Sequence, residues 1–336
     1  MSAASGSKAL NGKLVTVFGG SGFLGRHVVR ALARRGYRVR VAVRRPDLAE
    51  HVQPLGAVGQ IMPVQANLRH RWSVDRAVEG SDAVVNLVGV LYEAGAQTFD
   101  AVQDFGARAV AEAARGAGIS RVVHVSAIGA DPASASAYAR SKAAGEAGVL
   151  ETVPQAVILR PSIVFGPEDG FFNRFASMSR MSPVLPLVGG GETKFQPVFV
   201  GDVAEVVARA VDGELTAGAV YELGGPEVRS FRSCLELMLK VIRRNRIVAP
   251  IPFGLALGHR EMDPFERLYD PTVGVEIDPE VANLEQLTHP FAAFSPPREP
   301  SCDPLIADQV CPGQIFFPPC PSCQIVAQIF MVAFKL

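Results

Sequence analysis

The stretch Gly19-Gly20-Ser21-Gly22-Phe23-Leu24-Gly25 decides the fold of this 336-residue chain. It follows a short apolar run at residues 14–18 and opens a segment, residues 23–35, whose apolar side chains recur at helical spacing. Glycines let backbone N–H groups and the positive end of a helix dipole approach a phosphate closely. We therefore predict a strand, a phosphate-binding loop and a helix, with a cofactor contacting Gly19, Gly22, Phe23, Leu24 and Gly25.

Strand and helix patterns keep alternating after this loop. Short apolar runs predict strands at 38–43, 61–64, 83–88, 121–126 and 157–160. Helices are expected before the third strand and at 99–117 and 138–150. Such alternation implies right-handed βαβ crossovers. The predicted fold class is α/β, a doubly wound parallel sheet of the Rossmann type, with a small C-terminal substrate lobe formed mainly after residue 165.

The end of the second predicted strand bears on the identity of the cofactor. An acid at this position would bind the ribose 2′-hydroxyl of NAD(H), but the sequence has Arg44 and Arg45. Guanidinium groups suit a 2′-phosphate, so NADP(H) is favoured; NAD(H) stays open because an exposed arginine is often only solvated. We expect Asn67 and Leu68 to flank the adenine, and Val88 to contact the cofactor.

Further along the chain, three residues are of the kinds that take part in acid–base chemistry. Tyr138 and Lys142 are four residues apart and so share one face of a helix. The neighbouring cation is expected to favour the phenolate of Tyr138 and to lower its pKa. Ser126 ends the fifth predicted strand, at the carboxyl edge where α/β sheets bind ligands, and its hydroxyl is a candidate donor to a substrate carbonyl.

Together with the run from Arg160 and Pro161 to Pro167, these motifs resemble the short-chain dehydrogenase/reductase superfamily in its extended or atypical branch, which includes NAD-dependent epimerases and dehydratases. Four runs more narrowly resemble the 39 kDa accessory-subunit family of respiratory complex I (NADH:ubiquinone oxidoreductase) and its bacterial relatives; they lie at 17–25, 125–130, 196–203 and 221–226. The resemblance covers about residues 12–256. It implies a tightly held NADP(H), with Tyr138 and Lys142 in acid/base and ribose-binding positions and Arg160 and Pro161 beside the nicotinamide.

Three kinds of function are compatible with these residues. The resemblance favours an NADP(H)-binding protein with a structural or assembly role in or near complex I. The intact Ser126, Tyr138 and Lys142 instead suit an active NAD(P)-dependent reductase, epimerase or dehydratase acting on a small carbonyl or nucleotide-sugar substrate. A redox sensor that binds NADP⁺ and NADPH differently is the third.

The composition changes sharply after residue 250. Residues 251–336 hold 13 of the 25 prolines and four of the five cysteines, with 4 basic and 11 acidic side chains. We expect 257–336 to be a poorly packed tail, either divergent or read from a shifted frame. Its Cys320-Pro-Ser-Cys323 lacks a second paired knuckle, so no metal site is predicted.

Charge and hydropathy exclude some classes of partner and location. The chain carries 33 basic and 33 acidic side chains, which gives no basis for expecting a nucleic-acid partner. No segment has the ~20 apolar residues that span a bilayer. A cytoplasmic protein is expected, or one that complex I holds at the inner membrane, on the matrix side in a eukaryote.

Overall fold

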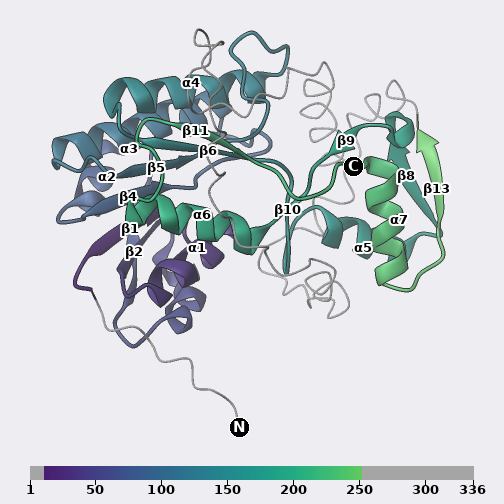
Figure 1. Ribbon diagram of the computed structural model, residues 1–336, viewed down its shortest axis with the longest axis horizontal. Coiled ribbons are helices and arrows are strands. Elements are labelled where there is room, and N and C mark those ends of the chain that lie inside the picture. Colours follow the sequence, from purple (N-terminus) through teal and green to yellow (C-terminus); the bar gives the residue numbers. More distant parts are fainter. Residues whose placement is uncertain (1–10, 252–336) are drawn as a thin grey trace, which may run out of the picture.

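A seven-stranded parallel sheet forms the centre of the larger part of the molecule (Figure 1). The computed structural model describes residues 11–251. In spatial order the strands are β11 (Val220–Leu223), β6 (Val157–Pro161), β5 (Val122–Val125), β4 (Ala83–Asn86), β1 (Leu14–Phe18), β2 (Arg38–Val43) and β3 (Ile61–Gln65). The strand order reverses between β1 and β4, and this is the point where open α/β sheets bind ligands.

Helices cover both faces of this sheet. On one face lie α1 (Phe23–Arg34) and α6 (Val200–Asp212); on the other lie α2 (Arg71–Val78), α3 (Phe105–Gly116) and α4 (Ala137–Thr152). All five residues of β1 are buried, as expected for a strand covered on both sides. The predicted α/β class, the doubly wound sheet and the six predicted strands are confirmed.

Two of the predicted helices differ from the structure. The segment between β2 and β3 forms two 3₁₀ turns, Pro46–Leu48 and Glu50–Leu55, instead of an α-helix. Pro54, inside the second turn, lacks the N–H that an α-helix needs there. The helix expected from residue 99 begins with a π-helical turn, Asp100–Asp104, before α3.

A small lobe lies beside the sheet domain in Figure 1, and it is built from two segments of the chain that are separated by α6 and β11. Its elements are α5 (Phe172–Met181), α7 (Phe231–Val241) and the strand pairs β8 (Val184–Val188) with β13 (Ile247–Ile251) and β9 (Lys194–Phe195) with β12 (Arg229–Ser230). Between the two parts, β7 (Val164–Phe165) pairs with β10 (Val198–Phe199). Phenylalanines in edge-to-face contact fill much of the core of the lobe. The proposed boundary at 256 and the tail at 257–336 lie outside the described residues.

No helix within residues 11–251 has the length and apolar content needed to cross a membrane.

The lobe core supplies a first prediction. Phe231 is fully buried, and its ring centroid lies 5.4 Å from that of Phe175 and 6.0 Å from that of Phe195. Phe231→Ala should lower the free energy of unfolding by about 3–5 kcal/mol, because it leaves a cavity. Urea denaturation measures this loss. Val228→Ala, at a side chain that is 60% exposed, should stay within about 0.5 kcal/mol of wild type; equal losses in both variants would contradict the assignment of this core.

Candidate functional site

The glycine loop between β1 and α1 leaves no room for a side chain at Gly25 and little at Gly19. A Cβ atom on Gly25 would overlap Gly19 O and lie 2.6 Å from the carbonyl carbon of Gly20. Gly19 has a φ of +77°, and a Cβ there would lie 3.3 Å from Val88 Cγ2. The start of α1 therefore presses directly onto the loop, with Val88 alongside. Its first-turn N–H groups have no carbonyl partners within the helix, so this bare cradle fits a pyrophosphate.

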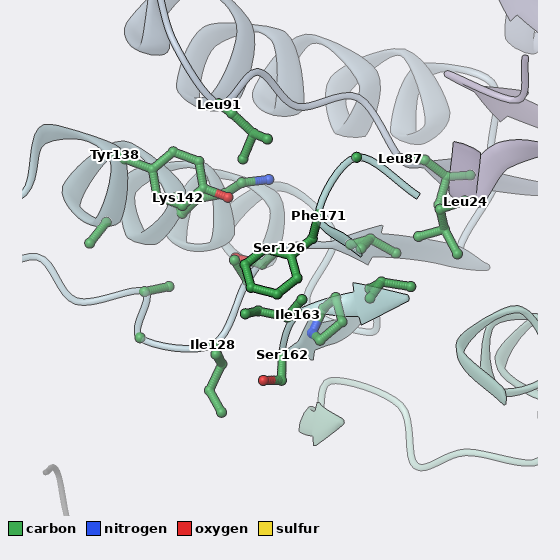
Figure 2. Close-up of a pocket in the computed structure, with 18 of the residues that line it drawn as sticks. Leu24, Leu87, Leu91, Ser126, Ile128, Tyr138, Lys142, Ser162, Ile163 and Phe171 are labelled. Carbon is green, nitrogen blue, oxygen red and sulfur yellow. The ribbon is translucent and has the colours of Figure 1, made fainter. Parts of the chain in front are cut away.

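A cavity of about 390 Å³ lies beside this cradle. Six of the predicted site residues line it: Phe23, Leu24, Ser126, Tyr138, Lys142 and Pro161. The remaining wall is largely apolar and includes Leu87, Leu91, Ile128, Ile163 and Phe171. Figure 2 shows Leu24 and Leu87 at the opposite end of the cavity from Tyr138. The sequence analysis did not predict this apolar wall, because its residues come from four separate loops, those that follow β4, β5, β6 and β7.

Ser126 places an unsatisfied hydroxyl at the cavity wall. Its backbone N–H donates to Leu159 O at 2.7 Å, which continues the pairing of β5 with β6. The residue is only 5% exposed, and its Oγ has no hydrogen-bond partner among the described residues. Because an unpaired buried hydroxyl costs free energy, this Oγ is suited to donate to a ligand carbonyl.

Tyr138 and Lys142 leave the same face of α4, as predicted from their spacing (Figure 2). The Tyr138 ring packs edge-on against Phe99, with centroids 5.8 Å apart. The expected lowering of the phenol pKa is wrong: burial raises the pKa of Tyr138 to about 12. Desolvation in these surroundings disfavours the phenolate, so Tyr138 is a protonated donor at neutral pH.

Lys142 is the buried cation of the site. It is 5% exposed, and burial lowers its pKa to about 8, with Glu146 acting in the opposite direction. Glu146 lies one turn further along α4, and its carboxylate accepts hydrogen bonds from Arg160 Nε at 2.9 and 3.2 Å and from Arg160 Nη2 at 2.6 Å. Arg160 thus anchors α4 to β6 and is not among the residues that line the cavity.

Beneath Lys142 lies a neutral pair that the sequence analysis did not identify as part of the site. Asn86 Oδ1 accepts from the Val88 N–H at 3.1 Å, which leaves Asn86 Nδ2 to donate to His124 Nδ1 at 3.2 Å. His124 is 2% exposed, and its pKa is lowered to about 3 by burial and then by Lys142. An uncharged imidazole therefore adds no positive charge next to the lysine.

The remaining predicted contacts lie away from the cavity. Arg44 and Arg45 are exposed at the end of β2. Arg45 pairs with Asp47 at 2.8 Å, whereas no ion pair or hydrogen bond joins the Arg44 side chain to another residue within 11–251. Arg44 is therefore the freer of the two guanidinium groups.

Asn67 and Leu68 hold their own loop together. The Asn67 carboxamide accepts from Arg69 N at 3.1 Å, and the Leu68 side chain is buried against α3. Their predicted contact with adenine stays a prediction.

Within the described part of the chain, no three His, Cys, Asp or Glu side chains cluster as metal ligands would. Cys320 and Cys323 lie outside that part.

These features define a Rossmann-type fold with a cavity lined by Tyr138 and Lys142, and the comparison with family models identifies its class. The model described as "NAD dependent epimerase/dehydratase family" matches residues 15–224. The chain belongs to this family, as its motifs predicted.

Individual proteins are also similar to this chain in sequence. The chain is 37% identical over 254 residues to NADH dehydrogenase [ubiquinone] 1 alpha subcomplex subunit 9 of Arabidopsis thaliana, covering 75% of this chain and 63% of that protein. It is 39% identical over 175 residues to a ceramide reductase of Caulobacter vibrioides, covering 52% and 54%. A quinoline-1-oxide ketoreductase of Stigmatella aurantiaca is 31% identical over 267 residues, covering 71% and 76%.

Solved structures agree on the fold. DesIV, a dTDP-glucose 4,6-dehydratase from Streptomyces venezuelae with NAD bound, superimposes with a TM-score of 0.61 at 23% identity, covering 76% of this chain and 94% of that one. At this identity the likeness establishes the fold alone.

The burial of Lys142 predicts a pH-dependent cost to stability. A lysine titrates near 10.5 when exposed, and its pKa of about 8 here means that the folded state loses the proton first. Between pH 8 and 10.5 the unfolded chain binds more protons, so the stability of the ligand-free protein rises with pH. Lys142→Met should raise the free energy of unfolding at pH 7 by about 3 kcal/mol, and this gain should shrink by pH 10.5.

Urea denaturation at the two pH values measures the difference. Lys240→Met, at an exposed position on α7, is the matched control and should show no such change. A Lys142→Met effect that is the same at both pH values would contradict the lowered pKa.

Proposed function

We propose that this chain is an NADP(H)-binding protein of the complex I accessory-subunit type, with a structural, assembly or redox-sensing role. The observation that carries the proposal is the bare glycine loop, which opens onto the cavity that holds Tyr138 and Lys142. The similarity to alpha subcomplex subunit 9 over three quarters of this chain supports the accessory role. The chain spans about two thirds of the length of such relatives.

The residues present suit each part of such a cofactor. The pyrophosphate would rest on the amides at the start of α1, between Gly19 and Gly25. Lys142 would hold the nicotinamide ribose, and the apolar cavity beyond Phe23 and Leu24 would take the nicotinamide ring. Arg44, free at the end of β2, is the preferred donor for a 2′-phosphate.

The partners and location follow the same proposal. The protein would bind complex I subunits, in the cytoplasm of a bacterium or on the matrix side of the inner membrane in a eukaryote.

Mass spectrometry of the nucleotide released when the purified protein is denatured tests the identity of the cofactor. NADP(H) is expected, and a protein that neither retains nor takes up any adenine dinucleotide would refute the proposal. Co-purification with complex I tests the partner.

Arg44→Ala should weaken NADPH binding by about tenfold or more and change NADH binding little, because only NADPH carries the 2′-phosphate. Calorimetric titration of both nucleotides measures this ratio. Arg34→Ala, exposed at the far end of α1, is the control and should alter neither affinity. Equal losses for the two nucleotides would argue against a 2′-phosphate site at Arg44.

A second function, reduction of an apolar ketone, is favoured by the unpaired Ser126 hydroxyl in an apolar cavity. The reduced nicotinamide, when bound, supplies the hydride. Ser126 Oγ would hold the carbonyl oxygen, and Tyr138, with its pKa of about 12, would donate its proton to that oxygen. Lys142, one turn away, would stabilise the phenolate that remains. Among the described residues that line the cavity, the ionisable side chains are Tyr138 and Lys142, so this part of the wall offers no arginine to a nucleotide-sugar diphosphate.

Tyr138→Phe separates the two functions. It should lower the rate of any ketone-dependent oxidation of NADPH by about 100-fold or more, while the affinity for NADPH changes little. Tyr92→Phe, at a side chain that is 49% exposed, is the control. The reductase would be excluded in favour of the accessory role by two results together. The wild-type protein would oxidise NADPH with none of a panel of aliphatic and aromatic ketones, and Tyr138→Phe would leave binding to complex I unchanged.

A further inference from the structure

An ion pair crosses from the start of α1 to the small-lobe side of the cavity. Arg26 Nη1 pairs with Glu168 Oε2, and both side chains are about 30% exposed. Arg26 follows the glycine loop directly and lies three residues after Phe23, which lines the cavity. Residues three apart share a helix face, so Arg26 lies on the side of α1 that faces the cavity.

Glu168 comes from the loop opposite. This loop joins β7 to α5, and its residues Gly170 and Phe171 line the cavity. The Arg26–Glu168 pair therefore links two walls of the space into which the proposed cofactor must fit, and one of its ends is next to the phosphate cradle.

The backbone at Glu168 is held in an unfavourable conformation. Its φ of +71° lies in the left-handed region that side chains with a Cβ rarely adopt. Such strain persists only where the surroundings fix it. Here the neighbouring Asp169, 2% exposed, accepts hydrogen bonds from the N–H groups of Gly166 at 3.2 Å, Phe171 at 2.8 Å and Phe172 at 2.6 Å. The clamped loop thus directs Glu168 towards Arg26.

Arg26 also has capacity for another acceptor. Its Nε is buried and has no hydrogen-bond partner among the described residues. A guanidinium has five N–H donors, so one carboxylate contact leaves donors for a phosphate. A phosphate placed on the amides of the adjoining helix turn would attract Arg26 and repel the Glu168 carboxylate.

We propose that Arg26 is a phosphate-binding residue of the dinucleotide site, and that Glu168 occupies its guanidinium when no dinucleotide is bound. This inference rests on the proposed function and assigns two residues of the same site. Binding exchanges the carboxylate of Glu168 for a cofactor phosphate, so Glu168 lowers the affinity for the dinucleotide. The same exchange releases the tie between α1 and the β7–α5 loop, so the small lobe is less constrained when cofactor is bound.

Calorimetric titration of the full chain with NADPH tests this assignment. Glu168→Gln removes the competing charge and should tighten binding by about fivefold, a gain of the size expected for a half-exposed ion pair. Arg26→Ala should weaken binding by about tenfold or more. Both effects should diminish in 0.5 M NaCl, because salt screens the charges.

Two further variants make the outcome decisive. Glu168→Gly also lacks the carboxylate but accepts a positive φ, so it should tighten binding even if Glu168→Gln folds poorly. Glu227→Gln breaks the exposed Arg229–Glu227 pair in the small lobe and should leave the affinity unchanged. Weaker or unaltered NADPH binding in both folded Glu168 variants would overturn the inference. Wild-type protein that binds no NADPH would instead refute the proposed function.

Discussion

The close approach of Gly25 to the backbone of Gly19 and Gly20 is the constraint on which the site depends. With no Cβ between them, α1 starts against the end of β1 and its free N–H groups face the cavity. Any side chain at residue 25 would push the helix away from the loop. The strand order reverses at this point, so the helix dipole, the carboxyl edge of the sheet and the cavity coincide.

The buried charge of Lys142 is the second feature that shapes the site. Lys142 is held beside apolar walls, where its ammonium is destabilised. Glu146 compensates from the next turn of α4, and Arg160 in turn neutralises Glu146. On the sheet side His124, which is hydrogen-bonded to Asn86, is kept neutral by burial and by the charge of Lys142. This arrangement keeps a charged lysine next to Tyr138 at the expense of stability, which is common where a binding site must hold a reactive group.

The parts of the molecule that repeat a simple period were predictable from the sequence. Each central strand is a short apolar run, and Tyr138 and Lys142 are set by helical spacing, so their shared face followed directly. The protonation state of Tyr138 was not predictable, because it depends on Phe99 and other apolar neighbours brought together only by folding. Arg160 looked like a cofactor contact at a strand end, yet its partner is Glu146, fourteen residues earlier on a different element. The positive φ of Glu168 has no sequence signal of the kind that a glycine would give.

The central claim is that a dinucleotide pyrophosphate binds the amides between Gly19 and Leu24, and hydrogen exchange followed by mass spectrometry tests it most directly. On addition of saturating NADPH, peptides that cover residues 19–24 should exchange more slowly, because phosphate oxygens accept from those N–H groups. Slowing that is confined to other parts of the chain, with the glycine loop unchanged, would contradict this account.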